Sequence, residues 1–126
     1  MIVADTHAFI WWAHDRNELS KTAKAALKSA DQILISAITG WEIALLVEKD
    51  RLWVGTDPLI WITDALARTQ IEVVPLPIDA AVRSVQLRQL RDPADQMIVA
   101  TALDLGLSLV TSDKRIRDSG LIETIW

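Results

Sequence analysis

The sequence lacks cysteine and tyrosine, and its 126 residues include only one phenylalanine, four glycines and four prolines. Without cysteine the chain has no disulfide framework, no thiolate metal ligand and no cysteine nucleophile, which favours a reducing, cytoplasmic location. No stretch rich in proline, glycine or serine resembles a linker. We therefore expect residues 1–126 to form a single domain.

Two further absences concern charge and apolar runs. The chain has 13 basic and 17 acidic residues, a net charge of −4, so no overall positive field is available to hold nucleic acid unspecifically. No apolar run approaches the roughly 20 residues of a membrane span, and the first five residues lack the basic start of a signal peptide. We expect neither membrane insertion nor export.

What the chain does have is an apolar fraction of 51%, gathered in short runs rich in β-branched residues. These runs are continuous, a pattern typical of strands covered on both faces. Five strands are predicted: Ile2–Ala4, Ile33–Ile35, Ile71–Val74, Leu107–Val110 and Ile122–Ile125.

Helical signals lie between these runs. Ser20 can cap a helix that runs to about Ala30, and Asp57 and Asp92 each precede a proline at a first helical position. Gly106 is a suitable end for the helix after Asp92. Strands that alternate with helices predict an α/β fold, in three layers around a central, mainly parallel five-stranded sheet.

Four carboxylates stand beside the predicted core. Asp5 ends the first strand, Asp113 follows the fourth, and Glu42 and Asp95 lie in the first turns of helices. Because strand ends and the helices that follow them meet at one edge of a parallel sheet, all four can converge there. The structural alternative is that each acid serves only as a helix cap or turn residue: Thr39 and Glu42 fit a capping box, and Asp95 is the third residue of its helix. Asp92, directly before a proline, is interpreted as a cap alone.

Convergence of four carboxylates requires a compensating cation, since like charges in one pocket destabilise the fold. An all-oxygen ligand set favours one or two Mg²⁺ or Mn²⁺ ions, which suits phosphodiester hydrolysis by activated water. The hydroxyl groups of Thr6, Ser36, Thr111 and Ser112 are candidates to orient water or the ligands.

These motifs together resemble a known family. Asp5-Thr-His, Ile35-Ser-Ala-Ile-Thr-Gly-Trp-Glu42, Asp92-Pro-Ala-Asp95-Gln-Met-Ile-Val-Ala and Leu109-Val-Thr-Ser-Asp113 are similar, in order and spacing, to the motifs of PIN-domain ribonucleases. Among these they look most like the VapC-type toxins of bacterial and archaeal toxin–antitoxin pairs. Any one motif is weak, whereas the ordered set covers essentially the whole chain.

The resemblance implies a Mg²⁺- or Mn²⁺-dependent endoribonuclease whose metal ligands are Asp5, Glu42, Asp95 and Asp113. It also implies a cognate antitoxin of the VapB type as inhibitor and a homodimeric state. The four acids together carry as much negative charge as the whole chain has in excess. The acidity that argues against unspecific nucleic-acid binding can therefore be concentrated in the site that cuts RNA.

Other residues are assigned more simply. Trp41 and Trp61 lie in apolar helical patterns and are predicted to be core. The adjacent Trp11 and Trp12 cannot both face one core, so one of them is a candidate contact for a protein partner. His7 and His14 are interpreted as a packing and a surface residue. The basic side chains are either a solvated face or RNA contacts at the rim of the groove. They are Arg83, Arg88 and Arg91, which accompany the predicted helical stretch Ile78–Leu90, and Lys114, Arg115 and Arg117, which follow Asp113.

Three other functions remain as alternatives. A haloacid-dehalogenase-like phosphatase needs a second aspartate two residues after Asp5, where this chain has His7. A receiver domain needs paired acids near the first strand, which are absent. A PIN fold retained as a binding or scaffold module is the non-enzymatic alternative, and metal-dependent RNA cleavage separates it from the nuclease.

Overall fold

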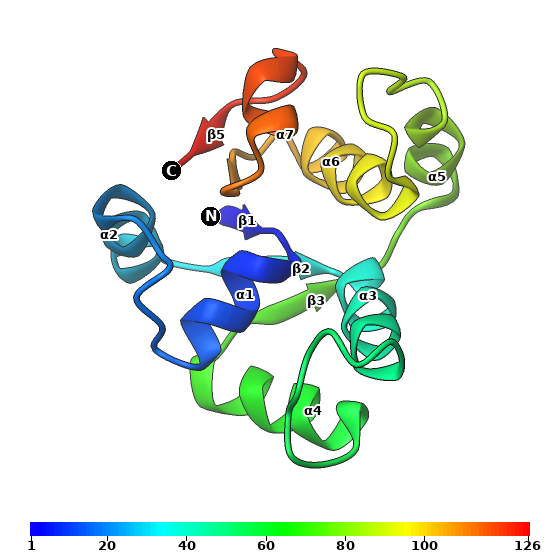
Figure 1. Ribbon diagram of the computed structural model, residues 1–126. Helices are drawn as coiled ribbons and strands as arrows, with labels where there is room; N and C mark the ends of the chain where they lie inside the picture. Colours follow the sequence, from blue (N-terminus) through cyan, green and yellow to red (C-terminus); the bar gives the residue numbers. More distant parts are fainter.

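The computed structural model describes residues 1–126 as a five-stranded, entirely parallel sheet between layers of helices (Figure 1). The order in the sheet is β3-β2-β1-β4-β5. The strands are β1 (Ile2–Ala4), β2 (Ile33–Ser36), β3 (Glu72–Val74), β4 (Leu109–Val110) and β5 (Thr124–Ile125). All five predicted strands are present, and β3, β4 and β5 begin one or two residues later than expected.

Seven helices connect and cover the strands. They are α1 (Thr6–Ala13), α2 (Lys21–Ser29), α3 (Ala37–Glu48), α4 (Pro58–Thr69), α5 (Ile78–Ser84), α6 (Pro93–Leu105) and α7 (Lys114–Ser119). The predicted caps of α2, α4 and α6 are confirmed: Ser20, Asp57 and Asp92 each accept backbone N–H groups of the first turn. Gly106 ends α6 with a φ of +65°, a backbone conformation that favours glycine.

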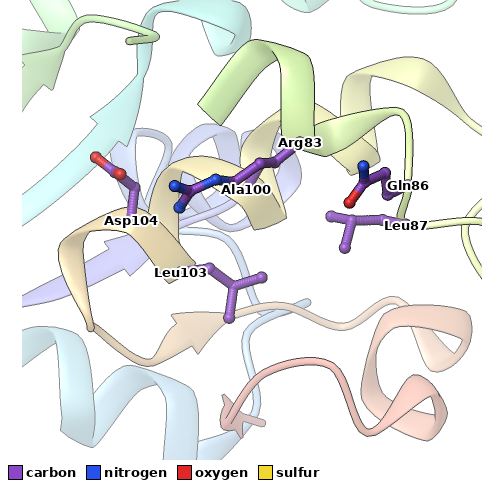
Figure 2. A pocket seen from close by; sticks show the side chains of 6 residues that line it. All are labelled: Arg83, Gln86, Leu87, Ala100, Leu103 and Asp104. Carbon is purple, nitrogen blue, oxygen red and sulfur yellow. The ribbon is translucent and has the colours of Figure 1, made fainter. Parts of the chain in front are cut away.

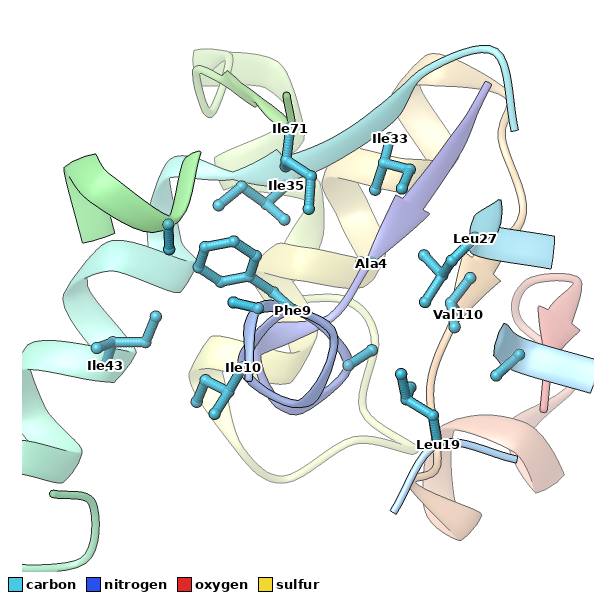
Figure 3. Close-up of a cluster of buried hydrophobic side chains, with 14 of the residues drawn as sticks. Ala4, Phe9, Ile10, Leu19, Leu27, Ile33, Ile35, Ile43, Ile71 and Val110 are labelled. Atoms are coloured by element: carbon cyan, nitrogen blue, oxygen red, sulfur yellow. The ribbon is translucent and has the colours of Figure 1, made fainter. Parts of the chain in front are cut away.

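The core is divided by the sheet, because successive side chains of a strand point to opposite faces. On one face Ala4, Ile35 and Val110 pack with α1, α2, α3 and α4 around the fully buried Phe9 (Figure 3). On the other face Val3 and its neighbours in β2 and β4 pack against α6 and α7. The continuous apolar runs follow from this double coverage. The edge strand β3 is an exception, with exposed Glu72 and Val73.

Two predicted helical features are wrong in detail. The stretch Ile78–Leu90 is helical only to Ser84, after which the chain turns, and the side chain of Gln96 donates hydrogen bonds to the carbonyls of Leu87 and Leu90 at 3.1 and 2.7 Å. Helix α3 is capped by Ser36, so Thr39 lies inside the helix and does not form a capping box. Hydrogen bonds from Gln96 of α6 hold the turn after α5, whereas the local hydrogen bond from the Ile38 N–H to Ser36 sets the start of α3.

The prediction for the two helical tryptophans is half confirmed. Trp61 is 7% exposed and packs edge-on against Phe9. Trp41 is 52% exposed, because it lies about 200° around α3 from the buried Thr39 and Ile43. None of the seven helices has the length and apolar character that crossing a bilayer requires.

Candidate metal and nuclease site

The site lies at the carboxyl edge of the three adjacent strands β2, β1 and β4. The chain leaves β1 at Asp5, β2 at Ser36 and β4 at Thr111, and α1, α3 and α7 begin within a few residues of these points. Strand order reverses around β1, since β2 and β3 lie on one side and β4 and β5 on the other. Crevices in open α/β sheets form at such a reversal.

Asp5 is the most buried acid, at 8% exposure. Its Oδ1 accepts the Ala8 N–H at 2.8 Å, so it caps α1, and its Oδ2 accepts the hydroxyl of Thr111. Burial raises the pKa of Asp5 from 3.8 to about 6, although these hydrogen bonds and the nearby His7 favour the charged form. The carboxylate is thus held in place by two elements and poorly solvated.

Asp95, the third residue of α6, is half-buried. Its pKa is raised from 3.8 to about 7, first by burial and then by the charges of Asp92, Asp113, Glu42 and Asp5. The charge of Glu42 also acts on Asp5. The structure therefore brings all four acids singled out in the sequence into one electrostatically coupled group, together with Asp92.

Asp92 is the member that sequence reasoning missed. Carboxylate oxygens of Glu42, Asp92 and Asp95 lie within 4.8 Å of one another, a spacing at which one cation can contact all three. Asp92 is a cap as predicted, because its Oδ1 accepts the N–H groups of Ala94 and Asp95 at 2.8 and 3.3 Å. Each carboxylate has about four acceptor positions, so the cap leaves room for a second role. Its spacing of three residues from Asp95, within one helical turn, was the available signal.

Buried hydroxyl groups tie together the elements that carry the acids. Thr6 donates to Thr39 on α3 at 3.3 Å, and Thr101 on α6 lies 3.3 Å from the hydroxyl of Ser36. Thr111 accepts the Asp113 N–H at 3.1 Å while it donates to Asp5. Three of the four hydroxyl residues expected near the site thus link its elements. The fourth, Ser112, is half-buried and makes no side-chain hydrogen bond.

The predicted basic residues fall into two exposed groups. One group surrounds α5; there Arg83 extends into a hollow of about 290 Å³ between α5 and α6 that contains none of the four acids (Figure 2). The other group follows Asp113 on α7, where Lys114 pairs with Asp118 and leaves Arg115 and Arg117 without an ion pair. Only the α7 group follows a site acid directly along the chain.

Trp11 and Trp12 are both half-buried and pack beside the α1 face of the core. The ring of Trp11 contacts His7 at 5.5 Å between centroids and Trp126 at 5.9 Å. His7 is exposed, and the exposed His14 stacks on Trp61. Burial first, and then the charges of Arg16 and Arg68, lower the pKa of His14.

Replacing Asp92 with asparagine tests its second role. Asn caps helices as well as Asp, so the free energy of unfolding should change by only a few tenths of a kcal/mol. If Asp92 contacts the cation, the apparent affinity for Mn²⁺, measured by isothermal titration calorimetry, should fall at least about 10-fold, the lower limit for residues that only support metal ligands.

The matched control is Asp57→Asn. Asp57 caps α4 in the same way, before a proline and with Oδ1 accepting the N–H groups of Leu59 and Ile60, but it belongs to no acidic group. Equal Mn²⁺ affinities in Asp92→Asn and Asp57→Asn would show that Asp92 is only a cap.

Comparisons with known proteins find relatives that cover most of the chain. The family model for the PIN domain matches residues 2–120. Ribonuclease VapC22 of Mycobacterium tuberculosis is 30% identical over 116 residues, which are 92% of this chain and 89% of that protein. A toxin–antitoxin complex from Klebsiella pneumoniae superposes with a TM-score of 0.67 at 27% identity, covering 96% of this chain and 94% of the other. DNA-bound VapBC from Salmonella typhimurium gives a TM-score of 0.69 at 22% identity, covering 98% and 97%.

Proposed function

Because this chain belongs to the PIN-domain family and is a ribonuclease of the VapC type, we propose that it cuts RNA endonucleolytically as the toxin of a toxin–antitoxin pair, using Mg²⁺ or Mn²⁺. The observation that carries the proposal is the acidic group at the strand ends. Glu42, Asp92 and Asp95 lie within reach of one cation, and the charges of Asp5 and Asp113 act on the same carboxylate.

The donor set fits a hard divalent cation. The ligand atoms are carboxylate oxygens, which Mg²⁺ and Mn²⁺ prefer, and no cysteine or histidine pair competes. Burial first, and repulsion from neighbouring acids after it, raise the pKa values of Asp5 and Asp95. A divalent ion, or two, would remove that repulsion.

Each acid reaches the proposed metal site from a different element of the chain. Asp5, fixed by α1 and by Thr111, presents its carboxylate from the centre of the sheet. Glu42 and Asp95 approach from α3 and α6, and Asp113 from the start of α7. When bound, the divalent ion would activate water and neutralise charge on the phosphate. The exposed Arg115 and Arg117 are then placed to contact flanking phosphates.

We also propose two protein partners. The relative from Klebsiella pneumoniae is a toxin–antitoxin complex, and a VapB-like antitoxin is the corresponding inhibitor here. Trp11 and Trp12 remain candidate contacts with the antitoxin, since both retain exposed surface on α1, the helix that follows Asp5. A homodimer is expected from the family, with residues 1–126 of each copy acting as one PIN domain.

Metal removal tests the proposal. Purified protein incubated with a structured ribosomal RNA and Mg²⁺ should yield discrete fragments, and EDTA should abolish them because the acids alone cannot activate water. Primer extension maps the cut positions. Equal cleavage with and without EDTA would contradict the metal dependence. Absence of cleavage by protein that still binds its antitoxin would favour the scaffold alternative.

A further inference from the structure

A groove of about 420 Å³ runs between α1 and the connection from α3 to α4. Its walls include His7 and Trp11 of α1, and Arg51 and Trp53 of the connection. We propose that this groove holds a nucleotide of the RNA next to the cut, with its base against Trp53 and its phosphate at Arg51. This inference rests on the proposed ribonuclease function and adds a substrate-binding subsite to it.

Trp53 is the first observation. It is 85% exposed, the most exposed of the six tryptophans, although a large apolar ring normally avoids water. The ring lies beside Gly55, where a Cβ would be 3.3 Å from the Trp53 Cη2 atom. Gly55 has a φ of +76°, so the turn both permits and supports this position. A supported, exposed ring is a platform on which a base of any sequence can stack.

Charge is the second observation. Although the chain has more acids than bases, none of the nine residues that line the groove is acidic. Arg51 is exposed and forms no ion pair, whereas Arg16, on the same groove, is paired with Glu18. Burial lowers the pKa of His14, which disfavours a positive charge there. Arg51 is therefore the free cation that faces an incoming phosphate.

Position is the third observation. His7 lines the groove and lies two residues after Asp5, in the first turn of α1. From residue 5 to residue 11 helix α1 rises about 9 Å. That length corresponds to two or three stacked nucleotides at about 3.4 Å each. One RNA strand can thus reach the acids and the groove together.

A peptide of the antitoxin is the competing occupant, since Ile10, Leu46 and Leu52 give the groove an apolar floor. The unpaired Arg51, the lack of acids and the stacking surface of Trp53 favour RNA. If RNA occupies the groove, replacing Trp53 should lower the affinity for RNA. If the antitoxin occupies it, the same replacement should lower the affinity for the antitoxin, so one set of variants separates the two occupants.

The test uses a fluorescein-labelled, eight-nucleotide single-stranded RNA of mixed sequence. Its binding is measured by anisotropy with Mg²⁺ in an Asp5→Asn background, which prevents cleavage. Trp53→Ala should weaken binding between about fivefold and a hundredfold, as expected for loss of one stacked base. Trp53→Phe should restore most of the affinity. Arg51→Gln should weaken binding and reduce its salt dependence, whereas the control Lys28→Gln, at an exposed position on α2, should not.

Kinetics in the otherwise unchanged protein give an independent readout. Trp53→Ala should raise KM for RNA cleavage while kcat changes little, because the acids are untouched. Unchanged RNA affinity and KM in Trp53→Ala, in a protein that still cuts RNA, would overturn the subsite alone. Loss of antitoxin binding with unchanged RNA affinity would assign the groove to the antitoxin. Binding that depends on Trp53 in a protein that never cuts RNA would support the groove and contradict the nuclease.

Discussion

Replacing Asp5 or Asp95 with asparagine is expected to lower the rate of RNA cleavage by more than about 100-fold while the fold is retained. Loss of residues that merely support metal ligands already costs 10- to 100-fold, so loss of a ligand charge should cost more. Both acids belong to the coupled group at the strand ends. The rate is measured by single-turnover cleavage of a structured RNA at saturating Mg²⁺.

The fold should survive because asparagine keeps the hydrogen-bond acceptor. In Asp5→Asn the side-chain oxygen can still accept the Ala8 N–H, while the amide nitrogen takes the place of Oδ2 and can donate to the Thr111 hydroxyl, which then accepts. Circular dichroism and the melting temperature check this directly. Asp64→Asn is the control, because Asp64 is exposed on α4 and pairs only with Arg68. Full activity of a folded Asp5→Asn protein would remove Asp5 from the catalytic machinery.

The second large effect is on stability in the absence of metal. The free energy of unfolding of the wild-type protein, relative to Asp5→Asn, is expected to fall as pH rises from about 4 to about 7. Folding raises the pKa of Asp5 from 3.8 to about 6, so between these values the folded protein binds a proton that the unfolded chain has lost. Stability is therefore lost as pH rises, by at most about 3 kcal/mol for this group.

Asp95 should also lower the free energy of unfolding as pH rises, because its pKa is raised to about 7. His14 acts in the opposite direction, since its pKa is lowered and its folded form resists protonation as pH falls. Comparing wild type with Asp5→Asn at each pH cancels that contribution, because His14 is present in both proteins.

The measurement is urea unfolding in EDTA at pH 4, 5, 6 and 7.5. Near pH 4 the free energies of unfolding of Asp5→Asn and wild type should differ only by a constant offset. As the pH rises above 4, Asp5→Asn should become progressively more stable than the wild type. Mn²⁺ at pH 7.5 should reverse the difference by stabilising the wild type selectively. A difference that stays constant across this pH range would show that Asp5 does not titrate as its burial indicates.

The features that could be predicted from the sequence are those with local signals. Asp57 and Asp92 precede prolines, and that dipeptide alone is enough to indicate a helix start. The continuous apolar runs indicate strands, because strands covered on both faces do not alternate between apolar and polar residues. Parallel strands end at one edge, so Asp5 and Asp113 could be placed together without knowledge of any contact.

The features that escaped prediction depend on tertiary geometry. That Asp92 lies beside Glu42 follows from how α6 packs near α3, which no spacing along the chain records. The apolar neighbours of Trp41 predict a core position, but the buried side of α3 is the one that carries Thr39 and Ile43. Trp53 lies in the irregular connection between α3 and α4, and its exposure depends on the course of that segment. In each case a distant or irregular segment decides the environment of the side chain.

The hydroxyl pairs Thr6–Thr39 and Ser36–Thr101 carry no charge, so they hold α1, α3 and α6 together whatever the protonation state of the acids. The elements that carry the acids are thereby held together independently of any cation. Cation binding then requires little loss of conformational entropy, and it should proceed without a slow rearrangement of the backbone. If a divalent cation binds as proposed, it would relieve the repulsion among the acids, and this relief would add to the affinity for the ion.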